Sequence, residues 1–503
     1  MNLAATALTV LTAATALGAP PPPAVVRPHP SPSATSRLSL SAATAPPSAG
    51  PRVAAAPRVA RQWTTTDAAP IGRPLAVDGV LVGYVMRARH VYARGIAPAT
   101  GRMLWEQEVS PSLQPTGSEI APHRVGNHAV LLQPEPAFSP DHARLTVLDP
   151  RTGRELHRTP AMLFSSPPES CFAGRSVCAL ATPETGDPVR GYRLNLDSGA
   201  FIPYAETAPQ GARHLGPQGL IALGPTTAEQ IALLRDGTLH WQRPLPAVFP
   251  RVPATTGTRW TLHTNTNDAA TAHAANADAD AGADADAYTG SGYARGTRSK
   301  TAVTLDLARD PVSAGLDATD GHLLWRQYGT VIDCGGRIAL PGRGVRCRYR
   351  GTVTTTNASR TTTSAALKVN LEGFDPRTGK SRWSVPLGPA TALAVGAGRL
   401  PVADENTIVA PAPTGPLLID LRTGSTSKPA AGAVVWCPKA VRFPYRTATT
   451  MRTGGDVFTP CTPSGRPSVA SPPPATARAI GTVVANFAVI PTPTGYQGTE
   501  VTP

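Results

Sequence analysis

The chain has 503 residues, of which 55 are Pro and 46 are Gly, while only 5% are aromatic. Its 47 Lys and Arg residues exceed its 33 Asp and Glu residues, which gives a formal net charge of +14. Such a charge would suit an anionic partner, but the Arg are scattered and no recognition helix or base-stacking platform is present. We therefore expect no nucleic-acid partner, and the abundant Pro and Gly favour many turns and few helices.

The beginning of the chain carries an imperfect export pattern. Residues 1–26 contain no charged side chain, and residues 3–19 form a run of Ala, Leu, Thr and Val. This predicts that residues 1–19 are a signal peptide or a short membrane anchor, although the basic start typical of a signal peptide is missing. Residues 20–58 are rich in Pro, Ala and Ser, which predicts a disordered linker.

From residue 96 onward, an apolar run followed by a turn ending in Gly occurs seven times. In four copies a Trp follows four residues after the Gly, and in the others His157, Pro203 and Lys428 take that place. Successive turn glycines are 52, 46, 38, 84, 58 and 45 residues apart. The motif residues are Gly101 and Trp105; Asp149 and Gly153; Asp197 and Gly199; Asp236, Gly237 and Trp241; Asp317, Gly321 and Trp325; Asp375, Gly379 and Trp383; and Asp420 and Gly424.

Each copy has the features of a β-hairpin. The Asp side chain can accept hydrogen bonds from backbone N–H groups ahead of it, and Gly supplies the positive φ of the turn. The Trp begins the return strand, where it can lie between neighbouring sheets. A unit of about 40–50 residues is the size of a four-stranded propeller blade, so we expect an all-β fold with these Asp and Gly as structural turn residues.

The motif resembles the repeat of the PQQ-binding-like β-propeller family. Residues 99–105 (Ala-Thr-Gly-Arg-Met-Leu-Trp) and 377–383 (Arg-Thr-Gly-Lys-Ser-Arg-Trp) are the most similar copies, and the resemblance spans roughly residues 60–496. It implies a single β-propeller of the quinoprotein alcohol dehydrogenase-like superfamily. Because most members with this repeat bind no quinone, the resemblance is to the non-catalytic branch, which includes propeller lipoproteins of outer-membrane protein assembly.

The two ends of the repeat region predict how the ring closes. Trp63 is followed by Pro and an apolar run, as Trp105 and Trp383 are, so it resembles the last strand of a blade whose other strands lie elsewhere. We expect residues 434–437, 456–461 and 480–490 to pair with it, which would give eight blades and no open sheet edges. The alternative is seven blades with a loose tail. The expected propeller covers residues 59–497, with a tail at 498–503.

Six cysteines form three local pairs, Cys171/Cys178, Cys334/Cys347 and Cys437/Cys461. Each pair brackets a short segment with Gly or Pro, at the position where the first two strands of a blade should form a hairpin. Neighbour pairing into disulfides is the interpretation we favour, with zinc binding or reduced buried thiols as alternatives. Disulfides place the protein outside the cytoplasm, secreted or anchored at the cell surface. The preference for Arg over Lys, with abundant Ala, Pro and Gly, is typical of actinobacteria.

A low-complexity insert, at about residues 263–300, explains the long gap between Gly237 and Gly321. Its alternating Asp residues suggest calcium, but Ala281 and Ala287 occupy the positions where a calcium-binding loop needs Gly and Glu. We interpret it as a solvated loop and expect no metal. Residues 352–364 are expected to form a second loop or an edge hairpin.

No catalytic pattern stands out in the sequence. Adjacent cysteines and a Glu/Asn/Asp calcium set, expected of a quinone-dependent dehydrogenase, are missing, so we predict no catalytic residue and no cofactor. Five histidines are expected to be solvent-facing loop residues, and the sequence leaves open whether four carboxyl groups converge in a channel. The histidines are His90, His123, His128, His142 and His157, and the carboxyl groups are those of Asp310, Asp333, Glu372 and Glu405.

These observations favour a monomeric, exported, non-catalytic propeller. We expect it to act as a scaffold or sensor module that binds an unknown envelope protein or a cell-wall component. The alternative is an oxidoreductase that depends on pyrroloquinoline quinone and calcium. A hydrolase or lyase with carboxylates in the central channel is a third hypothesis.

Overall fold

The computed structural model describes residues 61–501, except for residues 89, 110–120, 136–141, 165, 185–186, 188, 206–212, 215–219, 224–229, 236–237, 250–257, 266–268, 277–301, 310–311, 333–343, 357–360, 395–398 and 445–450. The chain divides into two compact units, Met1–Arg58 and Val59–Pro503, and all described residues belong to the second. The expected signal or anchor segment, the linker and the Asp-rich part of the insert therefore lie outside the described residues. Within the described part, no helix has the length and apolar character needed to cross a membrane.

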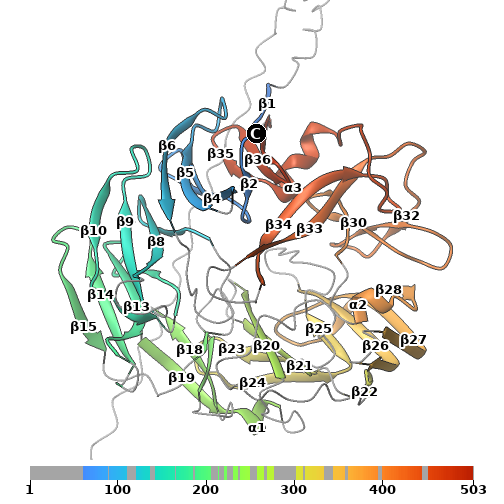
Figure 1. Cartoon of the computed structure of the whole chain (residues 1–503). Helices are drawn as coiled ribbons and strands as arrows, with labels where there is room; N and C mark the ends of the chain where they lie inside the picture. Colours follow the sequence, from blue (N-terminus) through green and yellow to red (C-terminus); the bar gives the residue numbers. More distant parts are fainter. Residues whose placement is uncertain are drawn as a thin grey trace, which may run out of the picture. The chain divides into compact units, whose positions relative to one another are not determined.

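The described strands of the second unit form eight antiparallel sheets, and the first four follow one another in chain order (Figure 1). The first sheet contains β2 (Ala69–Pro70), β3 (Leu75–Val77), β4 (Val80–Arg87), β5 (His90–Ile96) and β6 (Met103–Val109). The second contains β7 (His123–Val125), β8 (His128–Pro134), β9 (Ala143–Leu148) and β10 (Glu155–Arg158). The third contains β11 (Leu163–Phe164), β12 (Glu169–Cys171), β13 (Ser176–Thr182), β14 (Arg190–Asn195) and β15 (Phe201–Ala205). The fourth contains β16 (Arg213–His214), β17 (Leu220–Leu223), β18 (Gln230–Arg235) and β19 (Thr238–Pro244).

The later sheets are less regular, because strands cross between them or are added to them. The fifth contains β20 (Thr258–Asn265), β21 (Ala269–Asn276), β23 (Val312–Asp317) and β24 (Leu323–Tyr328). The sixth contains β22 (Ala302–Asp306), β25 (Thr330–Ile332), β26 (Gly344–Thr356), β27 (Thr361–Phe374) and β28 (Ser381–Gly388). The seventh contains β29 (Val402–Asp404), β30 (Thr407–Ala410), β31 (Leu417–Asp420), β32 (Thr426–Ser427), β33 (Val435–Pro444) and β34 (Met451–Cys461). The eighth contains β1 (Gln62–Thr64), β35 (Thr482–Val484), β36 (Phe487–Thr492) and β37 (Gly495–Glu500).

Helices are few and short in the described part. They are α1 (Leu245–Val248), α2 (Thr391–Ala394), a 3₁₀ turn (Pro474–Thr476) and α3 (Ala477–Ile480). The fold is thus an all-β propeller, as the repeat motif predicts.

The eighth sheet joins the two ends of the described chain. In Figure 1, β1 lies with β35 and β36, and Trp63 is in register with Gly498 of β37. The predicted pairing of the Trp63 strand with C-terminal strands is therefore confirmed. Two details were wrong: residues 498–500 are part of β37 rather than a tail, and β33 and β34 belong to the seventh sheet. The blade number of the ring stays a prediction.

Two further segments differ from the prediction. Strand β21 occupies residues inside the expected insert and pairs with β23, so the insert begins only after Asn276. Strand β22, which follows the insert, then joins the sixth sheet by pairing with the far half of β26. Residues 352–356 pair with residues 361–365 in the distal part of the β26 and β27 strands, which agrees with the hairpin alternative.

The hydrophobic core is divided among clusters that lie between neighbouring sheets. For example, Leu131 of the second sheet packs with Tyr84 of the first, and Val147 of the second packs with Val177 of the third. Similar buried clusters join the fourth to the fifth, the fifth to the sixth, the sixth to the seventh, the seventh to the eighth and the eighth to the first sheet. Among the side chains that the structure describes, no such cluster joins the third sheet to the fourth.

Candidate interaction surface

The motif aspartates are turn-forming residues. Oδ1 of Asp149 accepts hydrogen bonds from the backbone N–H groups of Arg151 (2.8 Å) and Thr152 (3.0 Å), and Gly153 follows with φ +70°. Asp317, Asp375 and Asp420 each accept a backbone N–H two residues ahead in the same way. Burial raises the pKa of Asp149, but these backbone hydrogen bonds outweigh it and the net shift is downward. The carboxylate is thus ionised and engaged in the turn.

The third copy of the motif uses a different residue from the one expected. Asn195, not Asp197, accepts the backbone N–H groups of Asp197 and Ser198, each at 2.9 Å. Asp197 instead forms an exposed ion pair with Arg175 at 3.0 Å. An Asn amide oxygen has the same reach as an Asp oxygen, which explains why the turn is kept. Asp236 and Gly237 lie outside the described residues.

Trp63 and the four motif tryptophans each connect one sheet to the next. Nε1 of Trp105 donates to the carbonyl oxygen of Pro150 in the following turn at 2.7 Å, and its ring lies against Gly153. A Cβ atom on Gly153 would lie 2.6 Å from this ring, so only Gly leaves room for it. The same arrangement links Trp63 to Gly101, Trp241 to Gly321, Trp325 to Gly379 and Trp383 to Gly424. The predicted place of Trp between sheets agrees with these contacts.

His157 takes the place of Trp in the second sheet. Its Nε2 lies 2.7 Å from the carbonyl oxygen of Leu196 in the third sheet, and its ring lies against Gly199. The expectation that the five histidines are solvent-facing loop residues was therefore wrong for His157, whereas His90 is exposed as expected but lies on a strand. Four of them lie on strands, and His142 is buried with Nε2 2.9 Å from the carbonyl oxygen of Pro183.

The carboxyl groups considered for catalysis are not brought together in the described part. Glu372 is buried on β27, where it accepts hydrogen bonds from Arg346 (3.0 Å) and Arg348 (2.6 Å). Burial raises its pKa, but these bonds and charges outweigh it and lower the pKa overall. Glu405 lies 3.5 Å from Arg478 instead, and Asp310 and Asp333 lie outside the described residues. Glu372 is thus the ionised partner of a structural ion pair and holds no proton to donate.

Among the residues that the structure describes, no group of three or more His, Cys, Asp or Glu side chains could hold a metal ion.

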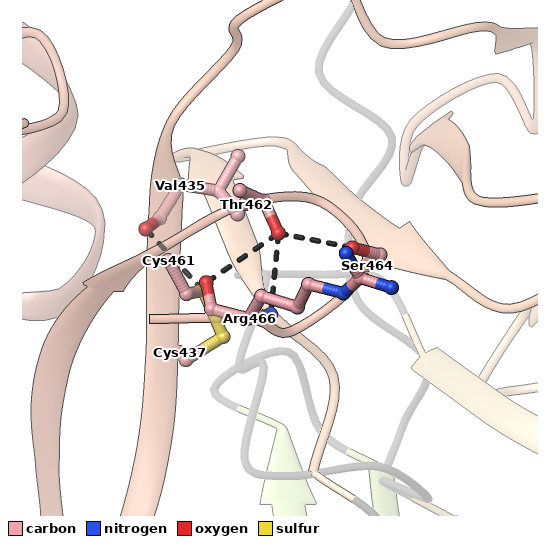
Figure 2. The surroundings of a disulfide bond; sticks show 6 residues. All are labelled: Val435, Cys437, Cys461, Thr462, Ser464 and Arg466. Carbon is pink, nitrogen blue, oxygen red and sulfur yellow. Dashed lines mark hydrogen bonds between the residues drawn. A yellow bond between two sulfur atoms is a disulfide. The ribbon is translucent and has the colours of Figure 1, made fainter. Parts of the chain in front are cut away.

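Two of the proposed cysteine pairs are disulfides in the structure, Cys171–Cys178 and Cys437–Cys461. Cys347 is also disulfide-bonded, and Cys334, its expected partner, lies outside the described residues. The expected common position in the repeat was wrong for the last pair. Strand β33 pairs with β29 and β34 pairs with β33, so both extend the seventh sheet instead of beginning the next one. Figure 2 shows this bond beside the turn at Thr462, whose Oγ1 contacts Ser464 at 3.0 Å.

The Cys171–Cys178 disulfide closes an unusual turn between β12 and β13. Phe172, Ala173 and Gly174 follow one another with φ of +50°, +57° and +81°. A positive φ is strained for a bulky residue such as Phe, and it persists only where the surroundings enforce it. The Phe172 side chain is nevertheless 48% exposed. The disulfide-closed turn therefore displays a large aromatic ring at the protein surface.

Residues from the two outer strands of the third sheet surround this ring. The Arg193 guanidinium of β14 lies 4.6 Å from the Phe172 ring centre, and Tyr204 of β15 meets the ring edge-on at 5.8 Å. Ile202 is directly opposite Arg193 in the register and is 42% exposed. A register shift at Gly191 leaves Tyr204 as the extra residue of β15, and such bulges re-aim side chains. We call Phe172, Arg193, Ile202 and Tyr204 the third-sheet surface.

The third-sheet surface lies where the tryptophan linkage is missing. Pro203 occupies the place of Trp in this copy of the motif, and its side chain is exposed. In the seventh sheet, where Lys428 takes that place, Trp436 packs with Ile480 and Ile490 of the next segment instead. No comparable replacement is found among the described residues of the third sheet.

The sequence contained only part of the signal for this surface. Phe172 stands inside a cysteine-bracketed turn, and an aromatic residue there could have been noted as unusual. The bulge at Tyr204 and the approach of Arg193 to Phe172 depend on strand register, which the sequence does not display.

Comparisons with known proteins give structural likeness only. No family model and no curated protein sequence matches the chain. Among solved structures, BamB from Moraxella catarrhalis is 12% identical, with 88% of this chain and 96% of that chain covered and a TM-score of 0.35. Quinohemoprotein alcohol dehydrogenase from Comamonas testosteroni is 12% identical, with coverage of 85% and 78% and a TM-score of 0.37. A europium-containing methanol dehydrogenase is 11% identical, with coverage of 75% and 84% and a TM-score of 0.36.

At these TM-scores the likenesses assign neither an activity nor a ligand to this chain. Its propeller fold follows from its own strand order, its closing sheet and its tryptophan contacts.

Proposed function

We propose that the protein is a non-catalytic, exported β-propeller that binds another envelope protein through its third-sheet surface. The single observation that carries this proposal is the exposed Phe172 ring, held in a strained turn by a disulfide and flanked by Arg193, Tyr204 and Ile202. Aromatic residues and Arg dominate the binding energy of protein interfaces, so this composition supports a binding role.

The structural roles of the motif aspartates and of Glu372 support the non-catalytic part of the proposal. The motif aspartates form turns, and Glu372 neutralises the buried Arg346, so these carboxyl groups have stabilising roles. The disulfides support a location outside the cytoplasm, where such bonds persist. Membrane attachment, if present, would depend on residues 1–19.

Site-specific photo-crosslinking tests the proposal in producing cells. A photoreactive amino acid is placed at Ile202 in one version of the full chain and at Met103 in a second version. Met103 lies on β6 of the first sheet and is 49% exposed, so it matches Ile202 in accessibility but not in surroundings. We expect a discrete crosslinked protein from position 202 that position 103 does not capture.

The opposite results have clear meanings. Identical products from both positions, or none from position 202, would contradict the proposal. Saturable binding of pyrroloquinoline quinone with calcium by the purified protein would favour an oxidoreductase instead.

A further inference from the structure

We infer that the third-sheet surface recognises an acidic peptide segment of its protein partner, with a carboxylate on Arg193 and a neighbouring apolar side chain against Phe172 and Ile202. This inference rests on the proposed binding function and specifies the chemistry of the partner. It follows from a comparison with three other arginines of this chain that lie over aromatic rings and also pair with a carboxylate.

Three other described arginines lie over a ring and are also paired with a carboxylate. Arg61 lies over Phe487 and pairs with Glu500, and Arg87 lies over Tyr92 and pairs with Glu106. Arg346 lies over Phe374 and pairs with Glu372. In each case the ring covers one face of the guanidinium, while the carboxylate accepts from its edge.

Arg193 has the ring but not the carboxylate. It lies over Phe172, and within the described part of the chain it forms no ion pair. Its Nε atom is buried and has no hydrogen-bond partner among the described residues. A carboxylate that reaches the edge of this guanidinium would form the charge-assisted hydrogen bonds that the other three arginines have.

The charge around Arg193 points in the same direction. Among the four residues of the third-sheet surface, Arg193 is the charged one, and none carries a carboxylate. A positive charge at such a surface disfavours a cationic partner and favours an acidic one. Ile202 adds an exposed aliphatic side chain to this surface, which suits an apolar side chain of the partner. A peptide with an acidic residue beside an apolar one meets both requirements.

Selection from a random phage-displayed peptide library tests this inference on the full, disulfide-bonded chain. The library is selected on the wild-type protein and depleted on Phe172→Asn, because Asn tolerates positive φ and should keep the turn. Enriched peptides are expected to share Asp or Glu next to an apolar residue. Ile202→Ser serves as a second depletion variant, and thermal unfolding verifies that both variants fold.

A double-mutant cycle then tests the role of Arg193. Replacing the shared Glu of a selected peptide with Gln is expected to weaken binding to the wild type by at least about tenfold, the scale of a lost charged hydrogen bond. The same replacement should change binding to Arg193→Gln by less than about twofold. Arg102→Gln, an exposed arginine of the first sheet, is the control and should behave as the wild type.

Any one of the following results would overturn the inference. Enriched peptides without an acidic residue would do so, and so would a tenfold effect that persists in Arg193→Gln. Retention on insoluble cell-wall polysaccharide that Phe172→Asn abolishes, without peptide enrichment, would identify a glycan instead. If the photoreactive residue at position 202 captures a partner whose affinity is unchanged by Arg193→Gln, the inference fails while the proposed function stands. If position 202 captures nothing in cells, the proposed function itself fails.

Discussion

The contact between Trp105 and Gly153 can be tested with two Gly→Ala substitutions that differ in one respect. Gly153 and Gly432 have almost the same φ, +70° and +74°. A Cβ on Gly153 would meet the Trp105 ring at 2.6 Å, whereas a Cβ on Gly432 would meet no atom within 4 Å. The backbone cost of Ala is therefore common to both variants, and only Gly153→Ala adds a clash between sheets.

The expected magnitudes follow from these two terms. A left-handed conformation costs Ala about 1–2 kcal/mol, which is the whole effect expected for Gly432→Ala. Overpacking adds about 1–3 kcal/mol, so Gly153→Ala should lose roughly 2–5 kcal/mol in the free energy of unfolding. The Trp105 ring cannot easily move away, because its Nε1 is bonded to Pro150 and Gly95 lies on its other side.

Urea unfolding followed by tryptophan fluorescence and circular dichroism gives the comparison, provided that the two probes coincide. The variant Trp105→Ala supplies the decisive control. In that background the clash is absent, and Gly153→Ala should cost no more than Gly432→Ala. Equal losses for the two glycine variants in the wild-type background would refute the proposed packing between sheets.

Three other predictions concern buried and turn-forming ionisable groups. Glu372→Gln leaves the fully buried Arg346 without its counter-charge and should cost about 3–5 kcal/mol by urea unfolding, whereas Glu500→Gln, at an exposed pair, should cost less than about 1 kcal/mol. Burial lowers the pKa of His123 to about 4, below the value of about 6.5 in an unfolded chain. As the pH drops, the unfolded state therefore binds a proton before the folded state does. The free energy of unfolding should consequently fall between about pH 7 and pH 4. His123→Gln should reduce that fall in thermal unfolding, and an unchanged pH profile would contradict the assignment. Asp149 has a folded-state pKa below its unfolded value, so its stabilisation should be lost below about pH 4; Asp149→Asn should keep the turn at neutral pH, as Asn195 does, and lose that acid dependence. A large loss for Asp149→Asn at pH 7 would show that the charge, rather than the hydrogen-bond geometry, holds the turn.

The features that the sequence predicted correctly depend on the residues of a single turn. An Asp or Asn, a Gly and a following Trp specify one hairpin, and their repetition specifies a propeller. The resemblance between Trp63 and the later motif tryptophans was sufficient to predict that its strand closes the ring with C-terminal strands. Short cysteine spacing also predicted the Cys171–Cys178 disulfide.

The features that were missed depend on which strand a segment joins. Strands β33 and β34 have the composition of a closing hairpin, but the pairing of β33 with β29 places this hairpin in the seventh sheet. The sequence around His157 resembles that of a surface histidine. Its contact with the carbonyl oxygen of Leu196 depends on the third sheet lying beside the second. The third-sheet surface needs both a bulge and a strained turn, and neither is visible before the register is known.

Hydrogen–deuterium exchange on the full chain, with and without the protein captured at position 202, tests the binding function most directly. We predict that the captured protein slows exchange in the turn between β12 and β13 and along β14 and β15, while β6 and the turn before it are unchanged. Protection confined to other sheets, with none in the third, would contradict the assignment of the third-sheet surface as the binding site.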